Sequence, residues 1–264
     1  MCRFNLIKKK IKKYLPNYLL KIYHQYFTIK FIYGYKSFKH AKENCGDGFD
    51  SNLIINKIYK AAILVPNKKN YERDGVNFDE IQYSWPLLSS ILLAINNNKL
   101  NVLDFGGSFG TTFYQNRKFL KHVKKIKWNI VEQEKIVDIA KNINFINFYK
   151  RIDDLKTKPD IALFCCSLCY LEDPYNILKK VINIKPNFIA IDRTPFTEKK
   201  EDLFAIQIVN KKIYKARLPI VIFSLDKFLN FFKKEYILIE KWISEEQPEL
   251  SDNYKGFLFK KKIN

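Results

Sequence analysis

Beyond residue 100 the chain alternates short apolar segments with helical patterns, and this alternation constrains the fold more than any other feature. Strands separated by helices are typical of an α/β fold with a largely parallel sheet. Later, a helix capped by Ser224 precedes two further apolar segments, which predict a closing pair of strands. The five expected parallel strands are residues 101–105, 127–132, 143–149, 160–166 and 187–192, and the closing pair is 235–242 and 254–262. The sequence therefore predicts a mostly parallel seven-stranded sheet with a closing antiparallel strand.

The first 98 residues have a different pattern. No Asp or Glu precedes Glu43, and "KKKIKK" at 8–13 introduces apolar residues at helical spacing. This predicts a basic amphipathic helix, which packs on its own domain or contacts an anionic inner membrane surface. Lysines interrupt it before about 20 apolar residues accumulate, so it cannot span a bilayer. Because residues 50–98 also have helical spacing, we divide the chain into an N-terminal helical region, 1–98, acting as a lid or docking surface, and a second domain, 99–264.

Composition narrows the possible partners and compartment. The net charge of +20 suits nucleic acid, but lysine, asparagine, isoleucine, phenylalanine and tyrosine are abundant together, as AT-rich codon usage produces. We therefore do not expect nucleic acid as the partner. The five cysteines are odd in number and three lie within 165–169, which fits a reducing cytoplasm and not a disulfide framework. Adjacent cysteines of a strand face opposite sides, so no metal site is expected.

A glycine-rich turn follows the first expected strand. In "NVLDFGGSFGTT", Asp104 stands two positions before Gly106, with Gly107 and Gly110 following. A dinucleotide fingerprint would need glycines where Ser108 and Thr111 stand, and a phosphate loop would need a lysine that the turn lacks. A carboxylate at this place repels a pyrophosphate but suits S-adenosylmethionine, which carries an ammonium and a sulfonium.

Glu132 ends the second expected strand, about two dozen residues beyond the turn. A carboxylate there can accept hydrogen bonds from both hydroxyls of a ribose. NAD-dependent oxidoreductases place an acid at the same position, so Glu132 alone does not discriminate between the cofactors. The glycine spacing disfavours NAD.

The motif "VLDFGGSFG" resembles the first motif of class I S-adenosylmethionine-dependent methyltransferases, with Ser108 in place of its middle glycine. Over residues 34–259 the chain also resembles a family of methyltransferases known from sequence, whose genes often lie in bacterial capsule, surface-polysaccharide and lipopolysaccharide clusters. The segments that carry this resemblance are "GYKSFKHAKENCGDGFD", "RDGVNFDEIQYSWPLL", "VLDFGGSFGTTFYQ", "WNIVEQ", "CSLCYLEDP", "DRTPF" and "QIVNKKIY" followed by "LPIVIFS".

The resemblance implies a Rossmann-like methyltransferase fold and a set of cofactor-binding residues. The glycine turn would hold the methionine moiety, Glu132 the ribose, and residues after the second and third strands the adenine. Ser167 follows the fourth strand, where the methyl group meets the acceptor. The implied cofactor-binding residues are Asp104, Gly106, Gly107, Ser108, Gly110, Glu132, Gln133, Asp153 and Ser167.

Polar residues at the other loops are candidates for acceptor chemistry. A sugar hydroxyl gains from a general base, and the candidates by position are Asp74, Tyr170 and Asp192. Arg73 and Arg193 could pair with a carboxylate or phosphate of an anionic acceptor. Gln207 is the single polar residue in "LFAIQIV", and a substrate hydroxyl is one possible partner of its amide. A loop ion pair or a cap is the alternative interpretation of each charged candidate.

The leading hypothesis is a methyltransferase that O-methylates a sugar or other component of a surface polysaccharide or its precursor. The alternatives are an RNA methyltransferase, and a non-catalytic scaffold of the same fold, which a filled cleft above Gly106 would favour.

Overall fold

The computed structural model describes residues 30–46, 48, 51–65, 71–209, 213, 216–244 and 253–263. The basic helix predicted before residue 30 lies outside them. The helices are α3 (Phe38–Glu43), α4 (Asn52–Ala62), α5 (Trp85–Leu93), α6 (Thr111–Asn116), α7 (Glu134–Ile139), α8 (Pro174–Asn183) and α9 (Leu225–Phe232). The strands are β1 (Lys30–Tyr35), β2 (Tyr71–Arg73), β3 (Val76–Phe78), β4 (Lys99–Phe105), β5 (Lys125–Val131), β6 (Ile146–Tyr149), β7 (Ile161–Cys165), β8 (Phe188–Thr197), β9 (Leu203–Ile208), β10 (Arg217–Ser224), β11 (Tyr236–Ile243) and β12 (Tyr254–Lys261). None of these helices has the length and apolar character needed to cross a bilayer.

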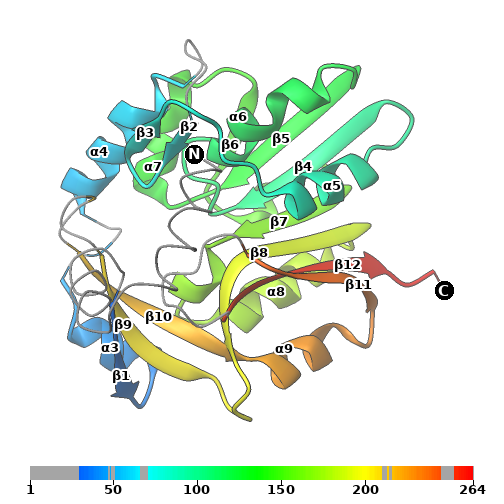
Figure 1. Cartoon of the computed structure of the whole chain (residues 1–264). Coiled ribbons are helices and arrows are strands. Elements are labelled where there is room, and N and C mark those ends of the chain that lie inside the picture. Colours follow the sequence, from blue (N-terminus) through cyan, green and yellow to red (C-terminus); the bar gives the residue numbers. More distant parts are fainter. Residues whose placement is uncertain are drawn as a thin grey trace, which may run out of the picture.

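Seven strands form the main part of the sheet, in the order β6, β5, β4, β7, β8, β12, β11 (Figure 1). The first five pair in parallel, and β12 runs antiparallel between β8 and β11. This arrangement confirms the predicted seven-stranded, mostly parallel sheet with a closing antiparallel strand. It also brings the carboxyl ends of β4, β5, β6, β7 and β8 to one edge.

The two faces of the central strands pack against different helices, because successive side chains of a strand point to opposite faces. Leu103 and Phe164 belong to a core cluster with residues of α8 and α9. Val102 and Leu163 belong to a second cluster with residues of α5 and with Tyr114 of α6. The sheet is therefore buried on both faces, which explains the nearly continuous apolar runs of its parallel strands.

A three-stranded antiparallel extension leaves the main sheet, and the sequence analysis did not predict it. β9 pairs with β1 and with β10, and β10 joins β8 through Phe223 and Ser224 beside Phe196 and Thr197. Figure 1 shows the extension at the lower left, with α3 next to it. β1 lies at the edge of the extension and is largely exposed, so its sequence lacks the apolar alternation that marks a half-buried strand.

β8 changes neighbours at an irregularity in its pairing. Its first residues pair with β7, and its last two pair with β10. The register with β12 shifts between Lys255 and Phe257, opposite the segment of β8 that contains Arg193. Arg193 has a φ of 52°, which is the left-handed region. Such a bulge bends a strand and changes the direction of a side chain.

The helical pattern predicted for residues 50–98 is only partly observed. α4 and α5 are helices, but β2 and β3 form an antiparallel hairpin between them. Asp74 and Gly75 connect the two strands with φ values of 52° and 74°. Positive φ at both central residues defines a type I′ turn, for which Asp-Gly is a preferred sequence. The sequence between the two helical segments had indicated a loop with a turn at Asp74 and Gly75; the turn is observed, and the short strands on either side of it were not predicted.

Candidate active site

A cavity of about 580 Å³ opens at the carboxyl ends of the parallel strands, which is within the usual range for a small-ligand site. Residues after β4, β5, β6 and β7, and Arg193 within β8, line it on the sheet side. Residues of α3, α4, the β2–β3 hairpin and the β9–β10 extension complete its wall. Gly106 is one of the lining residues, so the space above it is not filled by side chains. A filled space would have favoured the non-catalytic scaffold.

The glycine turn after β4 needs its glycines for steric reasons. Gly106 has a φ of 69°, and a Cβ there would lie 2.5 Å from the Cβ of Ser167. At Gly110, the N-cap of α6, φ is 96° and a Cβ would overlap the side chain of Ile146. Gly110 thus shapes the turn without lining the cavity, unlike Gly106, Gly107 and Ser108.

Ser108 occupies the position where the resembled motif has its middle glycine. Its φ is 52°, a conformation that glycine adopts without strain. Ser108 and Ser167 are both residues of the cavity wall, but their hydroxyl oxygens are buried behind it and lack a hydrogen-bond partner. Buried hydroxyls normally have partners, so these two are exceptions, and each side chain would have to rotate to reach a ligand in the cavity.

Asp104 lies beneath the turn and not on the cavity wall, which corrects the expectation of a direct contact with the ligand. A Cβ on Gly107 would stand 2.6 Å from the Asp104 carboxyl carbon, so Gly107 permits the turn to pack on this side chain. Trp128 donates its indole hydrogen to Asp104 Oδ2 at 3.1 Å, and Oδ1 has no partner. Burial raises the pKa of Asp104 to about 7, because desolvation disfavours the charged form.

Glu132 lines the cavity at the end of β5 and is held by the backbone. Ser108 N–H donates to Glu132 Oε1 at 3.1 Å, and Gln133 N–H donates to Oε2 at 2.9 Å. Burial raises the pKa of Glu132, and these two hydrogen bonds act in the opposite direction. Each carboxylate oxygen retains a lone pair with which it could accept a ligand hydroxyl.

Gln133 also lines the cavity, whereas Asp153 does not. Asp153 lies in a short 3₁₀ helix, Ile152–Asp154, and points to solvent, where it pairs with Lys180 at 3.3 Å. The neighbouring Arg151 and Ile152 take the place on the wall that the resemblance assigned to Asp153. One turn of 3₁₀ helix thus decides which side chain faces the cavity.

Glu72 is a cavity residue that the sequence analysis missed. It comes from β2 and is 2% exposed. Thr111 donates its hydroxyl to Glu72 Oε2 at 2.7 Å, and Gly75 N–H donates to Oε1 at 2.8 Å. Burial raises the pKa of Glu72. The segment was interpreted as a loop between helices, and the Asp-Gly hairpin signal beside Glu72 was the clue to its place.

Tyr170 and Gln207 meet on the cavity wall. Tyr170 donates its phenolic hydrogen to Gln207 Oε1 at 2.7 Å, and both residues line the cavity. Burial raises the pKa of Tyr170 well above its usual value. Tyr170 therefore keeps its proton near neutral pH, which does not suit the role of general base. The sequence had suggested a substrate hydroxyl as one possible partner of the Gln207 amide. In the structure, Gln207 Oε1 accepts its hydrogen bond from the phenol of Tyr170.

Asp192 is not on the cavity wall, contrary to its assignment as a candidate base. Its Oδ1 accepts hydrogen bonds from Trp242 Nε1, Ser244 Oγ and Arg193 N–H, at 2.9 Å each. Asp192 is 1% exposed. These contacts tie β8 to β11 and to the segment after it, so Asp192 supports the sheet.

The remaining candidates, Arg73, Asp74 and Arg193, all line the cavity. Arg73 and Asp74 come from the hairpin, where Arg73 donates to Gln82 Oε1 at 3.0 Å. Arg193 comes from the bulge of β8. The structure thus brings together side chains separated by about half of the chain.

Comparisons with known proteins bear on the fold. No protein-family model and no curated protein matches the chain. An S-adenosylmethionine-dependent methyltransferase structure from Methanosarcina mazei superposes with a TM-score of 0.50 at 10% identity, covering 69% of this chain and 100% of the other. A Clostridium acetobutylicum S-adenosylmethionine-dependent methyltransferase has a TM-score of 0.44 at 13% identity, covering 66% and 88%. The Synechocystis magnesium protoporphyrin IX methyltransferase has 0.46 at 11%, covering 82% and 87%.

The first of these similarities and the strand order together show that the chain has the Rossmann-like methyltransferase fold. The fold expected from the sequence is thereby confirmed. The fold alone does not define a reaction, which depends on the residues of the site.

Proposed function

We propose that the protein is an S-adenosylmethionine-dependent methyltransferase. The observation that carries the proposal is the charge around the turn after β4. Asp104 lies beneath Gly107, Glu72 binds Thr111 at the start of α6, and no basic residue lies between Gly106 and Gly110. Dinucleotide-binding folds place a pyrophosphate at this turn, where two carboxyl groups and the absence of a basic residue would leave it without a positive partner. A cofactor with an ammonium and a sulfonium is favoured instead.

The lining residues fit this cofactor. Gly106, Gly107 and Ser108 would hold its methionine end, and Ser167 lies on the cavity wall beside Gly106. Glu132 would accept hydrogen bonds from the ribose hydroxyls. Gln133 and Ile152 would contact the adenine, because they follow β5 and β6 on the same wall.

The bound cofactor would supply an activated methyl group. The chain would then have to position the acceptor in line with this group and accept its proton. Of the three candidate bases, Asp74 is the best placed for the proton, because it lines the cavity, whereas Asp192 is bonded elsewhere and Tyr170 retains its hydrogen. Glu72 and Glu132 also line the cavity, but both oxygens of each already accept hydrogen bonds from the protein. In such a transfer the acceptor oxygen would gain the methyl group, S-adenosylhomocysteine would be the leaving group, and Asp74 would accept the hydroxyl proton.

For the acceptor we propose a hydroxyl of a sugar or another component of a bacterial surface polysaccharide or its precursor. This part rests on the sequence resemblance. An RNA acceptor is the alternative that the test should separate.

Calorimetric titration of the full chain with S-adenosylmethionine, S-adenosylhomocysteine and NAD tests the cofactor. We expect the first two to bind and NAD not to bind. The variant Glu132→Ala should weaken S-adenosylhomocysteine binding, whereas the exposed control Glu43→Ala should not. NAD binding, or failure of both adenosyl compounds to bind, would refute the proposal.

Transfer of a labelled methyl group into fractionated cell extract then tests the acceptor. Label in a glycan or nucleotide-sugar fraction supports the polysaccharide assignment, and label removed by ribonuclease supports RNA. Asp74→Asn should lower kcat while leaving the affinity for S-adenosylhomocysteine unchanged. If kcat is unchanged, Asp74 is not the base.

A further inference from the structure

The part of the cavity wall near the carboxyl end of β7 combines two guanidinium groups with several unusual backbone conformations. We call this the Arg73–Arg193 wall, formed by Arg73, Asp74, Cys166 and Arg193, all of which line the cavity. We propose that this wall binds an anionic oxygen group, a carboxylate or a phosphate, carried by the methyl acceptor. The inference rests on the proposed function and names a chemical class for its acceptor.

The backbone supports a ligand-binding role for this wall. Eight non-glycine residues among those described have a positive φ. Asp74, Cys166 and Arg193 are three of them, with φ values of 52°, 56° and 52°. The conformation of Asp74 belongs to the type I′ turn of the hairpin and is ordinary for Asp-Gly. At Cys166 a left-handed conformation costs about 1–2 kcal/mol, and such conformations are frequent at ligand sites. At Arg193 the β8 bulge accounts for the conformation, and it directs the side chain to the cavity.

The two arginines are close enough to affect each other and to share neighbours. Burial lowers the pKa of Arg73, and the positive charge of Arg193 lowers it further. Tyr71 and Cys166 each interact electrostatically with both guanidinium groups. Cys166 directly follows β7, so the position between the arginines adjoins Ser167 and the glycine turn.

Groups of both signs meet near this wall. Lys42 of α3 also lines the cavity on the side of the β9–β10 extension, and the carboxyls of Asp74 and Glu72 line it too. Asp104 and Asp192 interact electrostatically with Arg193, so the anion would be recognised by the geometry of the two guanidinium groups and not by an excess of positive charge. Arg73 packs its guanidinium over the ring of Phe78 at 5.4 Å, which fixes its plane. A planar guanidinium with several donors matches a carboxylate or phosphate better than a neutral hydroxyl. Two such groups from different strands would orient an acceptor beside the cofactor turn.

Anion titration of the full chain tests the inference. Sodium acetate and sodium phosphate, each against sodium chloride at equal ionic strength, would be titrated by calorimetry into the protein with and without S-adenosylhomocysteine. We expect saturable binding of acetate, phosphate or both, and the comparison of the two tells which group the wall prefers. Arg73→Gln and Arg193→Gln should each weaken this binding about tenfold or more, as loss of a charge-assisted hydrogen bond predicts. The exposed control Arg217→Gln should leave it unchanged.

Arg193→Lys retains the charge without the planar fork, so it should fold and bind the anion more weakly than the native protein. Absence of saturable anion binding, or binding that survives both glutamine substitutions, would overturn the inference. If S-adenosylhomocysteine binds while the anions do not, only this inference fails. If the anions bind and S-adenosylhomocysteine does not, the proposed function fails and the anion site stands. Should Arg193→Gln not fold, Arg73→Gln, which lies on the partly exposed hairpin, decides alone.

Discussion

The hydroxyl of Thr111 donates to the carboxylate of Glu72 at 2.7 Å, and this bond joins the β2–β3 hairpin to the first residue of α6. Through it, a segment from the N-terminal third of the chain contacts the turn that follows β4. Because Glu72 is almost fully buried, the bond lies in a region of low dielectric, where a missing partner is costly.

Replacement of Thr111 by valine should therefore destabilise the protein. Glu72 Oε2 would remain buried without its donor, at a cost of about 1–3 kcal/mol. Urea unfolding monitored by tryptophan fluorescence measures the change. The exposed control Glu43→Gln should alter the free energy of unfolding by less than about 0.5 kcal/mol. Equal stability of Thr111→Val and the native protein would show that the hairpin does not depend on this bond.

Gly106→Ala should be more damaging than Gly46→Ala, although both glycines line the cavity. At Gly106 the new Cβ would meet Ser167 at 2.5 Å and φ is positive, whereas at Gly46 nothing lies within 4 Å. We expect a loss of at least roughly 2 kcal/mol and of cofactor binding for the first variant, and little change for the second. Denaturant unfolding and S-adenosylhomocysteine titration measure both effects. A stable, ligand-binding Gly106→Ala variant would contradict the geometry of the turn.

Ser108→Gly should stabilise the turn. Serine is strained at a φ of 52°, and its hydroxyl has no partner to lose. Glycine removes the backbone strain at this position, and this gain exceeds the entropic cost of a more flexible unfolded chain. The free energy of unfolding should therefore rise by about 0.5–1 kcal/mol. As a control, Ser89→Gly in helix α5 should lower stability by about 0.5 kcal/mol. Comparison of the two unfolding curves decides, and a loss at both positions would exclude strain at Ser108.

The buried carboxyl of Asp104 should make stability depend on pH. Its pKa rises from 3.8 to about 7 on folding, so the folded chain binds this proton more tightly than the unfolded chain. Stability is therefore lost as pH rises from about 4 to 7, by up to roughly 4 kcal/mol. Asp104→Asn cannot ionise, so its stability relative to the native protein should be greater at pH 8 than at pH 5. Parallel pH profiles for the two proteins would refute the assignment.

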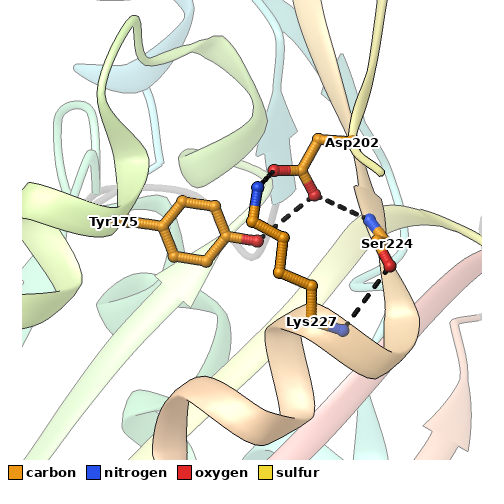
Figure 2. Close-up of polar contacts among 4 residues, drawn as sticks. All are labelled: Tyr175, Asp202, Ser224 and Lys227. Atoms are coloured by element: carbon orange, nitrogen blue, oxygen red, sulfur yellow. Dashed lines mark hydrogen bonds and ion pairs between the residues drawn. The ribbon is translucent and has the colours of Figure 1, made fainter. Parts of the chain in front are cut away.

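Asp202 fixes the start of α9, as Figure 2 shows. Its Oδ1 accepts from Ser224 N–H at 2.8 Å and from the Tyr175 hydroxyl at 3.2 Å, and its Oδ2 pairs with Lys227 at 2.7 Å. Asp202→Ala would leave the Ser224 amide without an acceptor, which should cost about 1–3 kcal/mol. Asp202→Asn retains an acceptor and should cost less. Thermal unfolding measures the three variants, with exposed Asp79→Ala as the control for loss of a surface charge. If Asp202 acted only through its charge, Asp202→Ala and Asp202→Asn would lower the melting temperature equally.

The sequence was sufficient for the elements whose signals are local. The five parallel strands are apolar runs, Pro174 marks the start of α8, and Ser224 caps α9 through its hydroxyl. Each of these depends on residues within a few positions of one another, so no tertiary information is needed. The hairpin at Asp74 and Gly75 also had a local signal, but its three-residue strands are too short to show alternation.

The site residues were harder to predict because their direction depends on contacts distant in sequence. Arg193 faces the cavity and Asp192 does not, and this division follows from the bulge opposite β12. Gln207 lies on the wall because β9 pairs with β1 and β10 in the extension. Asp153 is near the expected place but points outward, since a 3₁₀ turn rotates it away. The sequence was sufficient to predict where the strands end. The direction of each side chain at those ends depends on how the strand pairs with its neighbours, which the sequence does not show.

Because β8 pairs with β7 at its start and with β10 at its end, its middle residues connect the main sheet to the three-stranded extension. Its first half is anchored among β7 and β12, and its last residues belong with β10. The bulge that carries Arg193 lies between these two sets of pairings. If the proposed function holds, we expect substitutions in the β1–β9 or β9–β10 pairing to change acceptor binding with little effect on cofactor binding, because the glycine turn belongs to neither pairing.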